Sequence, residues 1–169
     1  MAVYWITGLS GAGKSTIGHN YYQRLLSKGK NVVFLDGDEL RLVMGGEDGY
    51  DKDTRKNLAF RYSRLCKLLS DQGLNVVIAT ISMFYDIQDW NRKNIQNYVE
   101  IYIKVPLDVL IKRDQKNLYS SNQKNVAGFS SQYEVPKNPD VVLINDGSEQ
   151  LHIVTDQLEL SLEKADLSI

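Results

Sequence analysis

The stretch that decides the fold is WITGLSGAGKST, residues 5–16. The apolar run stops at Gly8, and Gly8 to Ser15 fits G-x-x-x-x-G-K-[ST] at every fixed position. This motif follows a predicted strand at residues 3–7 and opens a predicted helix at Lys14, the context in which such a loop binds phosphate. The backbone N–H groups of the loop point at phosphate oxygens, and the helix N-terminus adds positive potential. The sequence therefore predicts a site for a nucleoside triphosphate.

Each part of the loop has an expected role in holding this donor. We expect Lys14 to reach the outer phosphates and the Ser15 hydroxyl to ligate Mg²⁺, with Thr16 as a supporting contact. The residues that the loop is predicted to place against ATP are Gly8, Ser10, Gly11, Ala12, Gly13, Lys14, Ser15 and Thr16. The loop alone leaves open whether the γ-phosphate passes to water, to a protein switch or to a second substrate.

Strand and helix patterns alternate outward from this loop. Besides residues 3–7, the apolar runs predicted to be strands are 31–36, 75–81, 98–105 and 140–144. The predicted helices are 14–28, 40–44, 53–72, 86–97, 106–113 and 148–164, the last capped by Ser148. Uninterrupted apolar strands that alternate with helices are typical of a buried parallel sheet. We therefore expect one α/β domain over residues 1–169, a five-stranded parallel sheet with helices on both faces.

Residues 114–138 break the alternation. Polar and turn-forming residues dominate this segment, and no hydrophobic period is sustained. A segment of this length without its own secondary structure is usually a functional lid or a disordered loop. We therefore expect a mobile lid over about residues 114–138.

The amino-acid composition limits the classes of binding partner and the cellular compartment that we expect for this chain. The chain has 169 residues with 20 basic and 21 acidic side chains, so it offers no broad charge for nucleic acid or an anionic membrane. Its one cysteine, Cys66, cannot form an internal disulfide, which favours a reducing compartment. Residues 1–11, MAVYWITGLSG, lack the basic start and the long apolar stretch that are typical of a signal peptide, and no apolar run reaches about 18 residues, so no membrane span is expected. These features predict a cytoplasmic protein with no nucleic-acid or membrane partner.

A second cluster of polar residues follows the second strand in LDGDELR, residues 35–41. The carboxyl ends of parallel strands face the ligand crevice, which places Asp36 and Asp38 near the phosphates. One of these carboxylates can orient Mg²⁺ or accept a proton from an attacking hydroxyl, and Arg41 suits an anionic acceptor. The alternative for Asp38 is a cap on the following helix, and Arg55 taken alone is typical of a surface charge.

Five stretches in chain order carry a resemblance that covers about residues 4–144. They are WITGLSGAGKST, LDGDELR, KLLSDQGLNVVIATIS, VEIYIKVPLDVLIKRDQKNLY and KNVAGFSSQYEVPKNPDVVL. Together they resemble the adenylylsulfate kinase family, whose members transfer the γ-phosphoryl of MgATP to the ribose 3′-hydroxyl of adenosine 5′-phosphosulfate. LDGDxxR and YE-x-P-x-NPD are more particular to this family than the phosphate loop is. Both stretches argue against a sugar-acid or nucleoside monophosphate kinase.

The resemblance implies roles for individual residues. It implies that Asp38 activates the acceptor hydroxyl, that Lys14 and Lys124 complete the catalytic set, and that Arg113 lies beside the ATP adenine. The implied acceptor site consists of Asp36, Asp38, Arg41, Arg55, Ile81, Ser82, Lys124 and Val126. Dimers are common in the family, so a homodimer is expected by analogy alone.

Departures from the family pattern gather at the acceptor side, whereas the donor motifs are intact. The family's F-I-S-P appears as Thr80-Ile81-Ser82-Met83, and Leu58 and Phe60 stand where the family has an asparagine and an arginine. Val126 replaces a lid phenylalanine that stacks on the acceptor's adenine, a contact worth roughly 1–3 kcal/mol. We therefore expect an acceptor that differs from the family's usual one.

One relative within the family fits these departures. Cytidine diphosphoramidate kinase, from bacterial capsule phosphoramidate synthesis, resembles adenylylsulfate kinase and phosphorylates the 3′-hydroxyl of a cytidine nucleotide. The chain is therefore expected to use ATP and cytidine diphosphoramidate. The alternatives are an adenylylsulfate kinase of sulfate assimilation and a non-catalytic nucleotide-binding module, which would need neither Asp38 nor Lys124.

Overall fold

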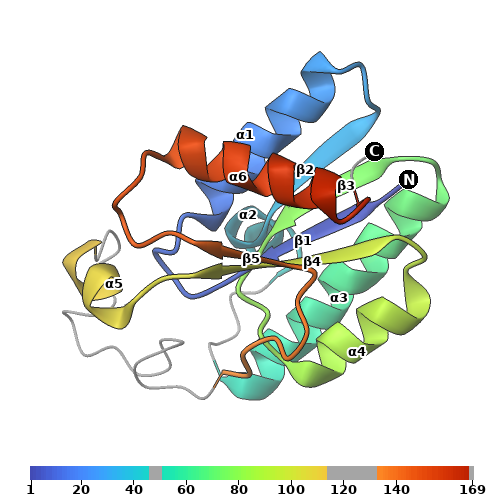
Figure 1. The fold of residues 1–169 in the computed structure, drawn as a ribbon. Coiled ribbons are helices and arrows are strands. Elements are labelled where there is room, and N and C mark those ends of the chain that lie inside the picture. Colours follow the sequence, from blue (N-terminus) through green and yellow to red (C-terminus); the bar gives the residue numbers. More distant parts are fainter. Residues whose placement is uncertain (46–50, 114–132, 168–169) are drawn as a thin grey trace.

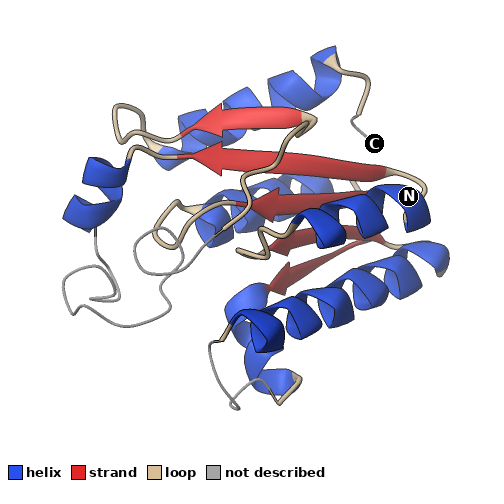
Figure 2. Ribbon diagram, turned by 90° about the horizontal axis from the view of Figure 1, so that it is seen from below, coloured by secondary structure: helices blue, strands red, loops and turns tan. Residues whose placement is uncertain are grey.

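The computed structural model describes residues 1–45, 51–113 and 133–167. Its five strands pair in parallel in the order β2-β3-β1-β4-β5, and all five arrowheads point to the same edge of the sheet (Figures 1 and 2). The strands are β1 (Val3–Thr7), β2 (Val32–Asp36), β3 (Asn75–Ala79), β4 (Tyr98–Lys104) and β5 (Val141–Ile144). The helices are α1 (Lys14–Ser27), α2 (Gly37–Val43), α3 (Lys52–Asp71), α4 (Tyr85–Asn94), α5 (Leu107–Arg113) and α6 (Leu151–Lys164).

Helices cover both faces of the sheet, and the central strand contributes to both cores. In β1, Tyr4 and Ile6 pack on the face covered by α1 and α6, whereas Val3 and Trp5 pack on the face covered by α3 and α4 (Figure 1). Alternate side chains of a strand point to opposite faces, so a strand buried on both sides is apolar at every position. The predicted α/β sheet with helices on both faces is confirmed.

Four predicted element ends differ from the structure by two residues or more. The helix predicted over residues 40–44 begins earlier, at Gly37, and the helix predicted over residues 86–97 ends earlier, at Asn94. β3 was expected to continue to Ile81, but it ends at Ala79 because the chain turns at Ser82, whose φ is 27°. Ser148 was expected to cap the last helix, yet α6 begins at Leu151. The Ser148 amide and hydroxyl instead donate to Asp146 Oδ1, at 2.9 and 2.6 Å, and this local turn delays the start of the helix.

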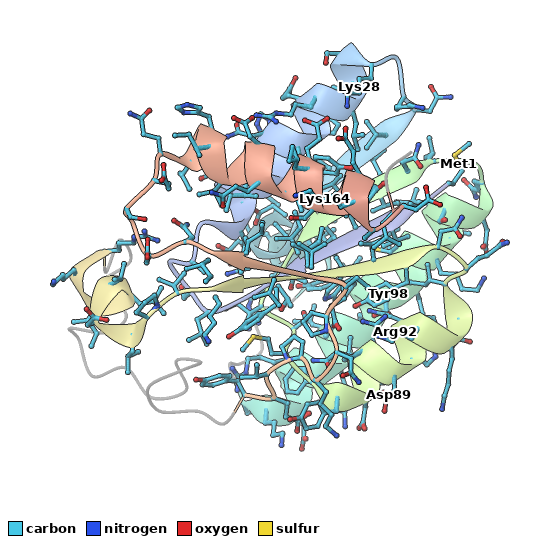
Figure 3. All side chains as sticks on the ribbon, viewed as in Figure 1. Met1, Lys28, Asp89, Arg92, Tyr98 and Lys164 are labelled. Atoms are coloured by element: carbon cyan, nitrogen blue, oxygen red, sulfur yellow. The ribbon has the colours of Figure 1, made fainter. Side chains whose placement is uncertain are left out.

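The lid predicted over residues 114–138 lies mostly outside the described residues, which resume at Tyr133. The segment that leads from Tyr133 to β5 is held against α4 by hydrogen bonds and ion pairs. Arg92 of that helix donates to the Asn138 carbonyl at 2.6 Å and forms ion pairs with Asp140 and Glu100, at 3.2 and 3.1 Å. Figure 3 shows Arg92 beside Tyr98, whose ring centroid lies 5.5 Å from the guanidinium carbon. The chain therefore returns to β5 along a defined path.

The buried carboxyl of Glu100 in this network predicts a pH effect on stability. Burial raises its pKa above the ordinary 4.5, against the opposing effects of Arg92 and Tyr98. The folded chain therefore holds this proton more tightly than the unfolded chain, so the group's stabilising contribution is full below pH 4.5 and is lost as the pH rises through the raised pKa. Relative to Glu100→Gln, the wild type should lose free energy of unfolding as the pH rises above 4.5, measured by urea denaturation. A difference that is constant with pH would contradict this prediction.

Among the described residues, the helices include none with the length and apolar character needed to cross a bilayer. Cys66 is a fully buried residue of α3, and burial raises the pKa of its thiol. A thiol in this environment packs as a small apolar side chain.

Candidate active site

A cavity of about 250 Å³ lies at the carboxyl edge of the sheet, between the phosphate loop, α2, the first half of α3 and residues 80–84. Its lining residues are Ser10, Gly11, Gly13, Lys14, Ser15, Thr16, Asp36, Gly37, Asp38, Arg41, Arg55, Leu58, Tyr62, Ala79, Thr80, Ile81, Ser82, Met83, Phe84 and Tyr133. The cavity therefore contains both the predicted donor loop and the described part of the predicted acceptor site.

The loop between β1 and α1 requires its fixed glycines because the chain passes close to neighbouring atoms. A Cβ on Gly8 would lie 2.6 Å from the Ile103 carbonyl oxygen. Gly13, at the N-cap of α1, has a φ of 89°, and a Cβ there would lie 2.8 Å from Asn145 Nδ2. A left-handed backbone conformation with no space for a side chain admits glycine alone. The two fixed glycines of the motif are thus explained by close backbone packing.

The positive groups of the donor site gather at the start of α1. Lys14 Nζ donates to the Leu9 carbonyl at 2.7 Å, which places the ammonium over the loop. Ser15 and Thr16 follow in the first turn of α1, which contains no acidic residue. The helix dipole, the lysine and the loop amides consequently favour an anion in this part of the cavity.

Asn145 braces the donor loop from the end of β5. It is buried, its Nδ2 donates to the Ala12 carbonyl at 2.9 Å, and its Oδ1 accepts from Arg113 at 3.2 Å. Arg113 is therefore adjacent to the loop but is not among the residues that line the cavity. Ala12 also lies behind the cavity wall, fully buried. Sequence reasoning did not single out Asn145, although its position directly after a buried strand could have indicated it.

Asp36, rather than Asp38, caps α2. Asp36 Oδ1 accepts a hydrogen bond of 2.8 Å from the Asp38 amide, as an N-cap carboxylate does. The alternative interpretation of Asp38 as the helix cap is therefore wrong. Asp38 lies in the first turn of α2, exposed and in the wall of the cavity. The cap fixes the turn that carries it, so Asp38 has a defined position near the donor loop.

Two arginines reach the acceptor side of the cavity, Arg41 from α2 and Arg55 from α3. Arg55 is half-buried, and its pKa is lowered by burial and by the charge of Arg41, against the opposing effect of Asp51. The interpretation of Arg55 as a surface charge is wrong, because its side chain lines the cavity. Two guanidinium groups that line one cavity and are partly withdrawn from water have the charge and donors that suit a phosphate-like anion.

The remaining wall is more apolar. Leu58 and Tyr62 share the face of α3 that carries Arg55, and the Tyr62 hydroxyl donates to the Gly37 carbonyl at 3.2 Å. Sequence reasoning missed Tyr62, but its spacing of seven residues from Arg55 places both on one helix face. Gly37 is closely packed there, since a Cβ on it would lie 2.9 Å from Thr80 Oγ1.

Residues 80–84, which we call the pocket loop, form the rest of the acceptor wall. Ile81 and Ser82 were expected here, and both line the cavity. The loop is held by the Thr7 hydroxyl, which donates to the Ile81 carbonyl, and by a 2.8 Å hydrogen bond between the hydroxyls of Thr80 and Ser82. Phe84 of this loop and Tyr133 also line the cavity, and sequence reasoning had assigned neither to the site.

The predictions for Lys124 and Val126 lie outside the described residues. The donors present suit Mg²⁺, because the Ser15 hydroxyl and the carboxylates of Asp36 and Asp38 line one cavity. Hydroxyl and carboxylate oxygens are the ligands that this ion prefers.

Comparison with known proteins agrees with this geometry. A family profile for adenylylsulphate kinase matches residues 1–144. Cytidine diphosphoramidate kinase of Campylobacter jejuni is 42% identical over 166 residues, covering 96% of this chain and 95% of the relative. The adenylyl-sulfate kinase of Aeromonas salmonicida is 37% identical over 162 residues, covering 92% of this chain and 83% of the relative.

Among solved structures, the Mycobacterium tuberculosis APS kinase CysC in complex with AMPPNP and APS superposes with a TM-score of 0.86. That protein is 30% identical, and the match covers 96% of this chain and 97% of the other. The fold, the phosphate loop and the full-length matches agree: the chain is a P-loop kinase that belongs to the adenylylsulphate kinase family.

Proposed function

We propose that this kinase transfers the γ-phosphoryl group of ATP to the ribose 3′-hydroxyl of cytidine diphosphoramidate. The observation that supports it is that Lys14, Asp38 and the arginine pair Arg41 and Arg55 all line one cavity. A donor-phosphate site, a carboxylate and an anion site in one cavity are the parts that phosphoryl transfer to a phosphorylated alcohol needs.

The reaction assigns each group a task. Lys14 and the loop amides hold the β- and γ-phosphates, while Arg41 and Arg55 hold the diphosphate-like group of the acceptor. The acceptor oxygen bonds to the γ-phosphorus as the bond from that phosphorus to the β,γ-bridging oxygen breaks, and ADP leaves. The hydroxyl proton passes to the Asp38 carboxylate. Mg²⁺, held by Ser15 and an aspartate of the cavity, would neutralise charge on the phosphates.

The choice of acceptor rests on the pocket wall and on the similarity to the C. jejuni relative. Leu58 and Met83 are buried in the acceptor wall, 4% and 2% exposed, and neither offers a hydrogen bond to a base edge. A site that specifies adenine by polar contacts would leave such groups unpaired with another base, and that cost gives discrimination. The apolar wall is therefore compatible with a base other than adenine.

An ADP-release assay with cytidine diphosphoramidate, CDP and adenylylsulfate tests this proposal. We expect the highest kcat/KM with cytidine diphosphoramidate, at least about tenfold above adenylylsulfate, which corresponds to about 1.4 kcal/mol. CDP separates the contribution of the base from that of the phosphoramidate group. Turnover with adenylylsulfate alone would overturn the proposed acceptor, and no turnover with any of the three would overturn the proposed reaction.

A further inference from the structure

Glu134 follows Tyr133, the residue at which the described chain resumes. Its hydrogen bonds reach the pocket loop and the start of α4. Its amide donates to the Met83 carbonyl at 3.0 Å, and its carboxylate Oε2 accepts from the Tyr85 amide at 2.5 Å. The Gln88 side-chain amide donates to the Glu134 carbonyl at 3.3 Å. The backbone and the side chain of one residue thus bracket the last residues of the pocket loop.

The Glu134 carboxylate supplies a hydrogen-bond acceptor for the start of α4 that the residue at the N-cap does not provide. The N-cap of α4 is Phe84, which makes no side-chain hydrogen bond to the helix. A free amide in the first turn needs an acceptor, and a negative charge there also interacts favourably with the helix dipole. Glu134 provides both from 49 residues further along the chain. Its Oε1 lies 3.8 Å from Lys52 Nζ at the start of α3, the helix that carries Arg55.

The pocket loop needs fixing at this end. Ser82 has a φ of 27°, a backbone conformation that residues other than glycine adopt only when surrounding contacts impose it. Thr7 and the hydrogen bond between Thr80 and Ser82 constrain the first half of the loop. Beyond Ser82, its two remaining residues, Met83 and Phe84, lie between those constraints and Glu134. Loss of the Glu134 carboxylate would therefore loosen the half of the loop nearest α4.

We propose that Glu134 is a positioning residue for acceptor binding. It holds the pocket loop against the acceptor through the Met83 carbonyl and the Tyr85 amide, and the same bonds place its neighbour Tyr133 in the cavity wall. The Glu134 carboxylate bonds to the chain rather than lining the cavity, so it acts through these neighbours. The kinetic consequence rests on the proposed function, whereas the effect on the loop does not.

The test compares Glu134→Ala with Glu134→Gln, which keeps an oxygen acceptor for the Tyr85 amide. Glu163→Ala, at an exposed glutamate of α6, is the matched control. With the acceptor that the wild type turns over fastest, we expect Glu134→Ala to raise the acceptor KM about tenfold, with the KM for ATP and kcat within about twofold. Glu134→Gln should stay within about threefold of the wild type. A general loss of structure would instead lower kcat and affect both substrates.

Hydrogen exchange of the apo protein provides the second measurement, which needs no acceptor. In Glu134→Ala, peptides that cover residues 80–88 should exchange at least about tenfold faster than in the wild type, while peptides of α1 and α6 should be unchanged. Unchanged exchange at residues 80–88, or an unchanged acceptor KM, would overturn the proposal. If the wild type turns over no acceptor, the proposed function fails, and exchange alone then decides whether Glu134 fixes the loop.

Discussion

Lys14→Ala is expected to lower ATP-dependent turnover by about 10³-fold or more, the range in which removal of a transition-state cation falls in phosphoryl transfer. The Lys14 ammonium lies over the donor loop, 2.7 Å from the Leu9 carbonyl, in the wall of the cavity. No other lysine of the described chain lines that cavity. Among the described residues, Lys14 is therefore the lysine that would bring a positive charge to the β- and γ-phosphates.

Steady-state kinetics with saturating acceptor, together with calorimetric binding of a non-hydrolysable ATP analogue, measure this effect. Lys164→Ala is the control, because Lys164 is an exposed lysine on the last turn of α6, labelled in Figure 3. The control should retain wild-type turnover and the wild-type midpoint of thermal unfolding. Near-normal turnover of Lys14→Ala would show that the loop after β1 is not the donor site.

Asp38→Asn is expected to lower kcat by about 10²-fold or more while binding of ATP is retained, as loss of a general base does. The asparagine keeps the size of the side chain but cannot accept the hydroxyl proton. Because Asp36 supplies the cap of α2, the change at position 38 leaves that capping bond and the helix in place. The effect should consequently appear in the chemical step.

Glu39→Gln is a closely matched control, since Glu39 is the next residue in the same first turn, is exposed, and loses the same charge. Single-turnover kinetics at saturating substrates should show a slow step in Asp38→Asn and a rate within about threefold of wild type in Glu39→Gln. Equal rates for the two variants would remove Asp38 from the role of base.

The elements that could be predicted from the sequence are those specified by local pattern. The strand before Gly8, the loop and the helix from Lys14 follow from one motif, and β1 and α1 begin where predicted. Short-range signals failed where a local hydrogen bond competed with a helix or strand. Asp146 binds Ser148 and delays α6, and the turn at Ser82 ends β3 early.

The candidate site likewise contains residues that the sequence predicted and residues that it did not. Asp38 and Arg41 were predicted from the motif that contains them, whereas the role of Arg55 was implied by the family resemblance alone; all three line the cavity. Tyr133 was missed because it reaches the cavity from a segment that is distant in the sequence from the other lining residues. The bracing role of Asn145 depends on a bond to Ala12 that spans 133 residues, and no local period records such a contact.

The sequence by itself determined the donor side, since a phosphate cradle is built from consecutive residues whose spacing encodes their geometry. It also determined the parallel sheet, because strands buried on both faces must be apolar throughout. Tertiary structure placed Asp38 in the wall of the cavity that the donor loop also lines, and it brought the two arginines together. It also placed Glu134 against the pocket loop. These are distances between segments separated in the chain, and packing of the whole domain sets them.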